Sequence, residues 1–168
     1  MTNVADDPIT GFDPDAIVRS ETVEIAAPAS VVWQVLIDLP RYNEWNPSCI
    51  RADSTLEMGA PVNMVLQSYA EPGKLFHVVE YICAFEPERL LSWAAPYDES
   101  WPYPARRDQV IEQTGPTSCR YHSTDAFYGE HGIHVFRFAG PWVKRSFDDS
   151  AYALKARAEA VYSGQVSF

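Results

Sequence analysis

The sequence predicts an α+β domain in which a curved antiparallel sheet wraps around one long C-terminal helix. Three observations support this prediction. Residues 48–128 alternate between apolar and polar side chains and are divided by turn residues, as expected of consecutive strands. One strand and two short helical segments precede this region. After it, the spacing of apolar residues changes from two to between three and four, which is typical of a helix.

The domain is predicted to start at residue 19. Residues 1–18 are acidic, contain two prolines and show no apolar period, so we expect an N-terminal extension there. The alternation around Val23 and Ile25 predicts the first strand. Pro28 is favoured at the first position of a helix, and apolar residues spaced by three or four follow it. A second short helix or turn comes next.

The middle of the chain predicts six antiparallel strands joined by tight turns. Glu71-Pro72-Gly73 and Gly115-Pro116 are typical turn sequences between such strands. Residues 96–104 are rich in proline and aromatic residues and are predicted to form a loop, because proline is excluded from central strands. The predicted strands cover residues 48–56, 61–70, 75–86, 89–95, 106–114 and 117–128.

The last predicted element is a helix from Pro141 to Tyr162. Gly140-Pro141 is a typical helix start, and Gly164 is a typical residue after a helix end. A helix of about 20 residues is roughly 30 Å long, which is enough to cross a curved sheet. We therefore assign residues 19–163 to one domain and residues 164–168 to a C-terminal tail.

Charge and motifs exclude several classes of function. The chain has 23 acidic and 13 basic residues and a net charge of -10, which disfavours a nucleic-acid partner. It has no apolar run of the ~20 residues that span a bilayer and no signal-peptide pattern, so we expect a cytoplasmic protein without a membrane partner. The spacing of Cys49, Cys83 and Cys119 predicts no zinc site. We expect no metal or cofactor, and either a monomer or a homodimer.

Three segments resemble the START-like (SRPBCC) superfamily, particularly its polyketide cyclase/dehydrase-like branch. They are VEIAAPASVVWQVLIDLPRYNEWNP, FEPERLLSW and FRFAGPWVKRSFDDSAYALKARAEA, and together the resemblance covers roughly residues 19 to 163. It implies the helix-grip fold, with a ligand held between the sheet and the long helix. The superfamily includes small-molecule carriers, lipid-transfer domains, hormone receptors, aromatase/cyclases and lyases, so the fold by itself does not define a reaction.

Strand alternation indicates which side chains of residues 117–128 face the interior. Cys119, Tyr121, Ser123, Asp125 and Phe127 share one face, which we place inwards because it carries the aromatic rings. The resemblance puts Ser123 and Asp125 where the family often has an inward His and Glu. A buried Asp125 would be a general acid or base, or an Asp hydrogen-bonded near a strand end. Tyr121 would donate a hydrogen bond to a ligand carbonyl, or fill space.

The same argument applied to residues 75–86 predicts that the odd positions face inwards. His77 would then offer a proton-transfer group beside the hydroxyl of Tyr81, while Glu80 would face outwards. A one-residue bulge would reverse this assignment. The inward set consists of Leu75, His77, Val79, Tyr81, Cys83 and Phe85.

Further ligand contacts are predicted from the loop and the long helix. Trp101 and Tyr103 would form a lid, and Arg107 would bind a carboxylate if it faces inwards, although the charges of its strand are typical of a solvated face. His131 and His134 have no third ligand that would predict a metal site. The remaining predicted ligand-binding residues are Tyr81, Cys83, Trp93, Ser123, Phe127, Phe147 and Leu154.

These observations favour a protein that binds a small, mostly apolar, aromatic or polyketide-like molecule. The alternative is a cofactor-independent cyclase, dehydratase or lyase, in which Tyr121 stabilises an oxyanion and Asp125 or His77 moves a proton. A third hypothesis is a module whose ligand regulates binding to a partner protein.

Overall fold

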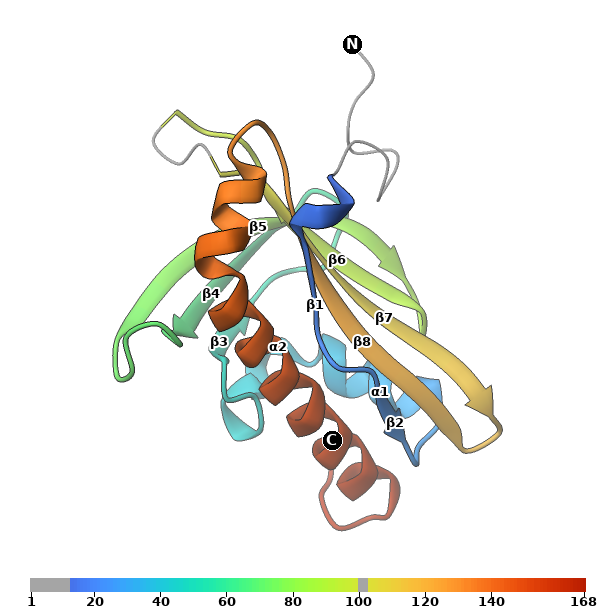
Figure 1. Cartoon of the computed structure of the whole chain (residues 1–168). Coiled ribbons are helices and arrows are strands. Elements are labelled where there is room, and N and C mark those ends of the chain that lie inside the picture. The colour runs from blue at the N-terminus through green and yellow to red at the C-terminus, as the bar shows by residue number, and fades with distance from the viewer. Residues whose placement is uncertain (1–12, 100–102) are drawn as a thin grey trace.

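The computed structural model describes residues 13–99 and 103–168 of the chain. Within these residues, eight strands form one antiparallel sheet, and a long helix lies across it (Figure 1). This confirms the predicted α+β helix-grip fold. The elements are η2 (Pro14–Ala16), β1 (Ile17–Arg19), β2 (Val23–Ile25), α1 (Ala29–Ile37), η3 (Leu39–Glu44), β3 (Cys49–Asp53), β4 (Pro61–Gln67), β5 (Leu75–Glu86), β6 (Leu90–Ala95), β7 (Ala105–Gly115), β8 (Ser118–Phe127) and α2 (Gly132–Tyr162).

The sheet is an open meander whose last strand, β8, pairs with the first two strands of the chain. Neighbouring strands follow in the order β1-β8-β7-β6-β5-β4-β3, and β2 also pairs with β8. The sheet starts at Ile17, two residues before the predicted boundary, because Ile17, Val18 and Arg19 pair with β8. Part of the predicted extension is therefore a strand of the domain. Hereafter, the inner face of the sheet is the one that α2 covers, and the outer face is the opposite one.

Helix α2 begins nine residues earlier than its sequence predicts. The sequence placed the start at Gly140-Pro141, but the helix runs from Gly132 and contains Pro141 in its interior. Pro141 is exposed, so the carbonyl that loses its backbone partner lies on the solvent side of the helix. Gly132 suits the true start, because a Cβ atom there would lie 2.5 Å from the carbonyl oxygen of Phe127. The predicted end is confirmed, with Gly164 at a φ of 77°.

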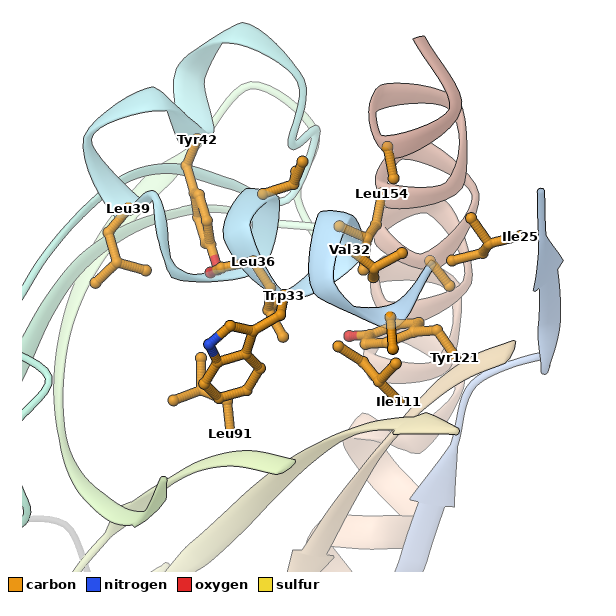
Figure 2. Packing of buried hydrophobic residues seen from close by; sticks show 14 of the residues in the cluster. Ile25, Val32, Trp33, Leu36, Leu39, Tyr42, Leu91, Ile111, Tyr121 and Leu154 are labelled. Carbon is orange, nitrogen blue, oxygen red and sulfur yellow. The ribbon is translucent and has the colours of Figure 1, made fainter. Parts of the chain in front are cut away.

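The main core lies between α1, the inner face of the sheet and the C-terminal half of α2 (Figure 2). Trp33 of α1 points towards Leu91 of β6, and Val32 lies near Leu154 of α2. The hydroxyl of Tyr42 donates a 2.6 Å hydrogen bond to the carbonyl of Leu36, which ties η3 to α1. This apolar core includes Ala151, Leu154, Ala158 and Val161 of the C-terminal half of α2. None of the described helices is long and apolar enough to cross a membrane.

A buried ion pair within β7 is linked to β6 by a serine hydroxyl on the outer face. Arg106 Nε donates to Asp108 Oδ1 at 2.7 Å, and the hydroxyl of Ser92 donates to the same oxygen at 2.6 Å. Arg106 and Ser92 are both buried. The expectation that the charges of this strand form a solvated face is therefore wrong for this pair. The hydrogen bonds compensate the loss of hydration, as buried charges require.

Truncation of Leu154 tests the packing of α2 on the sheet. We expect Leu154→Ala to lower the free energy of unfolding by about 3 kcal/mol, because the side chain is buried and its loss leaves a cavity. Tyr152→Ala on the same helix is the matched control, since Tyr152 is 56% exposed. Urea denaturation measures both variants. Equal losses in the two variants would contradict the packing described.

Candidate functional site

A bulge in β5 exchanges the two faces of that strand. Glu80 pairs with Val62 and Val78 pairs with Met64, and both partners belong to the buried core. Glu80 therefore faces inwards, and the pairing with β6 shifts by one residue between Ile82 and Ala84. The predicted outward placement of Glu80 is wrong.

The same exchange moves His77 and Tyr81 to the outer face. They pair with Val65 and Pro61 of β4, on the side away from the core, and Tyr81 is 43% exposed. The predicted inward placement of both residues, and of Leu75 and Val79, is wrong because the bulge lies after them. Phe85, beyond the bulge, does face the core, where its ring packs against Trp33.

Strand β8 has the predicted orientation. Cys119, Tyr121, Ser123 and Phe127 are buried, and Asp125 lies on the same face of the strand. Asp125 pairs with Val18 of β1 on one side and with Arg107 of β7 on the other. No bulge interrupts β8 between these positions, so the alternation of the sequence carries over into the fold.

Arg107 faces inwards at the centre of the sheet. It pairs with Asp125 and with Trp93 of β6, and its guanidinium carbon lies 4.1 Å from the ring centre of Phe147 on α2. The ring centre of Trp93 is 5.9 Å away. The cation is thus held between the sheet and the helix by two aromatic rings.

Two carboxyl groups share this environment with Arg107. Burial raises the pKa of Glu80 from its ordinary value of 4.5 to about 7, although the charge of Arg107 acts in the opposite direction. Burial also raises the pKa of Asp125, and the negative charge of Glu80 raises it further. The two acids repel each other and Arg107 attracts both, so this pair holds a proton more readily than isolated carboxylates do.

Three buried polar atoms at this site have no well-placed hydrogen-bond partner among the described residues: Arg107 Nε, Gln109 Nε2 and Ser123 Oγ. Burial raises the pKa of the Tyr121 hydroxyl, and Ser123 and Arg107 lie near enough to this hydroxyl to act in the opposite direction. Gln109 is 3% exposed and Ser123 is 0% exposed, and the two residues pair directly across β7 and β8. The hydroxyl of Tyr121 donates a long, 3.4 Å hydrogen bond to Gln109 Oε1. An unpaired buried donor destabilises a fold, so a group of them at one place points to a partner from outside the chain.

We call these side chains the inner polar cluster. The main core borders the cluster on one side, and a smaller apolar cluster with Val18, Phe127 and Phe136 borders it on the other. Glu80, Arg107 and Asp125 stay partly exposed on the inner face despite their position. The arrangement can therefore hold polar atoms of a molecule whose remainder is apolar. The cluster consists of Glu80, Arg107, Gln109, Tyr121, Ser123 and Asp125.

The other predicted site residues lie in different environments. Trp93, Phe147 and Leu154 are buried, the first two beside Arg107 and the last in the main core. Tyr103 precedes β7 in the chain. Its ring lies beside that of His131, the residue before α2, with 6.5 Å between the two ring centres. Trp101 lies outside the described residues.

Cys83 lies at the bulge of β5, and its thiol is influenced by charges of the outer face. Burial raises the pKa of this thiol, and Arg106 and Asp108 are among the groups that act on it.

No three His, Cys, Asp or Glu side chains gather as metal ligands in the described part of the chain. A small pocket between α1, α2 and Phe168 has room for about one water molecule and is separate from the cluster.

Sequence reasoning missed Glu80 and Gln109. A signal for Glu80 was present, because Phe76, Val78 and Ile82 make the even face of β5 nearly as apolar as the odd face. One charged residue in such a face is a candidate for a buried functional group. Gln109 offered no comparable signal, since its strand alternates among charged residues.

The fold, one antiparallel sheet crossed by a long C-terminal helix, is the helix-grip arrangement. Residues 17–159 match the family described as polyketide cyclase / dehydrase and lipid transport, and the chain belongs to this family. The resemblance seen in the sequence is thereby confirmed. A search of curated proteins found no match.

Solved structures from bacteria share the fold. A START superfamily protein from Mycobacterium smegmatis has a TM-score of 0.66 at 16% identity, over 86% of this chain and 98% of that one. The Zhui aromatase/cyclase from Streptomyces sp. R1128 has a TM-score of 0.63 at 19% identity, over 86% of this chain and 94% of that one. At such identities the likeness concerns the fold alone.

The buried carboxyl of Glu80 predicts a pH-dependent stability. Its raised pKa means that the folded protein keeps a proton that the unfolded chain has lost between pH 4.5 and about 7, so stability falls as the pH rises through this window. We expect Glu80→Gln to be more stable than the wild type at roughly pH 8, by up to about 3 kcal/mol, and equally stable near pH 5. Urea denaturation at both pH values measures the difference.

The exposed Glu57 supplies the control for this experiment. Glu57→Gln should follow the wild type at both pH values. If Glu80→Gln also follows the wild type, Glu80 is not desolvated in the folded protein.

Proposed function

We propose that the protein binds a small, largely apolar molecule between the inner face of the sheet and α2, and that acceptor oxygens of this molecule reach the inner polar cluster. The observation that carries the proposal is the group of unpaired buried donors on Arg107, Gln109 and Ser123. Ligand carbonyl, phenol or carboxylate oxygens would complete their hydrogen bonds. Membership of a family described by polyketide cyclases and lipid transport supports an apolar ligand.

The side chains around these donors favour a ligand whose main part is apolar and flat or elongated. The rings of Trp93 and Phe147 flank the guanidinium of Arg107, and apolar clusters lie on both sides of the polar groups. Binding sites for small molecules commonly have such a lining, with a few polar groups that fix the orientation of the ligand.

The charges of the cluster favour a neutral ligand. One cation, Arg107, stands against Glu80 and Asp125, and burial favours the protonated form of these acids. With one of the two acids protonated, the three groups have no net charge. A ligand with a carbonyl or hydroxyl oxygen then binds without a change in charge, whereas an anionic ligand requires uptake of a further proton.

An enzyme is the second candidate, because Glu80 has a pKa of about 7. A group with such a pKa both accepts and donates protons near neutral pH. It would take the place that the sequence analysis gave to His77, with Asp125 as the second carboxyl. In a cyclisation followed by loss of water, one carboxylate would remove a proton next to a carbonyl, and Arg107 and Tyr121 would stabilise the resulting enolate oxyanion. The enolate carbon would form the ring bond to a second carbonyl of the same molecule, whose oxygen takes up a proton and becomes a hydroxyl. Removal of a second proton next to the first carbonyl would then expel this hydroxyl as water, with its proton supplied by a protonated carboxyl.

Binding of Nile red, a flat neutral dye with one carbonyl oxygen, tests the ligand site. We expect one molecule to bind per chain with increased fluorescence, and we expect Gln109→Leu to weaken its binding about fivefold, the effect of one lost hydrogen bond. Tyr81→Phe is the control, because Tyr81 lies on the outer face. If the two variants bind the dye equally well, the proposed donors do not contact it.

Mass spectrometry of the purified protein mixed with a lipophilic cell extract distinguishes a carrier from an enzyme. A carrier should retain one compound unchanged at a fixed ratio to protein. An enzyme should consume a compound and form a product that differs by the mass of water. In that case we expect Asp125→Asn and Glu80→Gln each to slow the conversion at least about a hundredfold, the usual share of an acid or base catalyst. Full conversion by both variants would exclude this mechanism.

A further inference from the structure

The N-terminal half of α2 carries apolar side chains on two sides. Gly140, Phe136 and Val143 face the sheet, where they pack against Val18 or join its apolar cluster. Phe138 points away from it and is 75% exposed, the largest value among the exposed large apolar residues described. A helix that is apolar on both sides normally has a partner on both. In Figure 1 this half of α2, drawn in orange, has no other element in front of it.

Phe138 belongs to an aromatic pair on this outer side. Its ring packs edge-on against Trp142, one turn further along the helix, with 5.0 Å between the ring centres. Pro141, which is also exposed, lies between them on the same side. Trp142 is half-buried, so the apolar ridge that these three residues form is exposed mainly at Phe138 and Pro141, with one side of Trp142.

The charge of this half of the helix is opposite to that of the whole chain. Residues 132–147 contain Arg137, Lys144 and Arg145 and no Asp or Glu, although the chain has a net charge of -10. Arg137 is exposed and forms no ion pair with the residues described, and acidic side chains return only at Asp148. Lys144 forms ion pairs with Glu21 and Asp148, so Arg137 and Arg145, which have no ion pair among the described residues, supply the uncompensated positive charge of this half. Charges are screened beyond about 8 Å at physiological salt, so these two arginines act locally.

We propose that the outer side of residues 132–147 docks on an anionic lipid surface, with Phe138 and Trp142 at the level of the headgroups. An exposed aromatic ring and a half-exposed one beside unpaired arginines on one side of a helix are typical of helices that lie in the membrane interface. A second copy of the chain fits less well, because two cationic ridges facing each other would repel. Docking would bring the edge of the ligand site next to a source of apolar molecules.

Flotation with vesicles tests the docking. We expect the protein to bind vesicles of phosphatidylcholine with phosphatidylserine at low salt, and to bind vesicles of pure phosphatidylcholine much more weakly. Phe138→Ala and Arg137→Glu should each lower binding at least about fivefold, and high salt should release the protein. Tyr152→Ala is the matched control, because Tyr152 is an exposed aromatic residue on the C-terminal half of the same helix.

Brominated lipids give a second readout. Bromine in the acyl chains should quench tryptophan fluorescence in the wild type, and Trp142→Phe should remove most of this quenching while vesicle binding persists. Wild-type protein that stays free of anionic vesicles at low salt overturns the proposal, as does unchanged binding by Phe138→Ala. A dimer that dissociates in Phe138→Ala without any vesicle binding would assign the ridge to a second copy instead.

The docking does not depend on the proposed function. Phe138 and Arg137 are not part of the inner polar cluster, so their variants should bind Nile red as the wild type does. Gln109→Leu should conversely weaken dye binding and keep vesicle binding, which would show that the two activities are independent.

Discussion

Side chains of a strand alternate between two faces, so one extra residue in β5 decides the character of the interior. The bulge between Ile82 and Ala84 lets Glu80 and Phe85 both face inwards, although one is at an even and the other at an odd position. Without it, an inward Phe85 would place His77 and Tyr81 in the interior and Glu80 in solvent. The pair of acids around Arg107, and with it any acid-base chemistry, depends on this local shift in register.

The inner polar cluster is costly for folding and is therefore informative about function. An interior of this size could be closed with apolar side chains, as the neighbouring core around Trp33 and Leu154 is. The chain instead buries Gln109 and Ser123 with unpaired polar atoms and desolvates Glu80. Local features that destabilise a fold without structural benefit are concentrated at functional sites.

Helix α2 makes different contacts along its length. Its C-terminal half anchors the helix through Leu154 in the core, while Phe147 packs under Arg107 near its middle. Its N-terminal half exposes Phe138, whose ring packs against the half-buried Trp142. On the outer face of the sheet, the Arg106–Asp108 pair of β7 is separate from this arrangement. The same helix thus supports the fold, borders the inner polar cluster and carries an exposed surface.

The sequence by itself determined the class of fold, the order of the elements and the orientation of β8. These follow from periodicity and from turn residues, which act over a few neighbouring positions, and the inward Tyr121, Ser123 and Asp125 were predicted in this way. Only the tertiary structure decided the inward face of β5, the true start of α2 at Gly132 and the meeting of Glu80 with Arg107. A bulge leaves alternation intact on both sides of itself, and a proline can start or interrupt a helix, so contacts from distant segments make these choices.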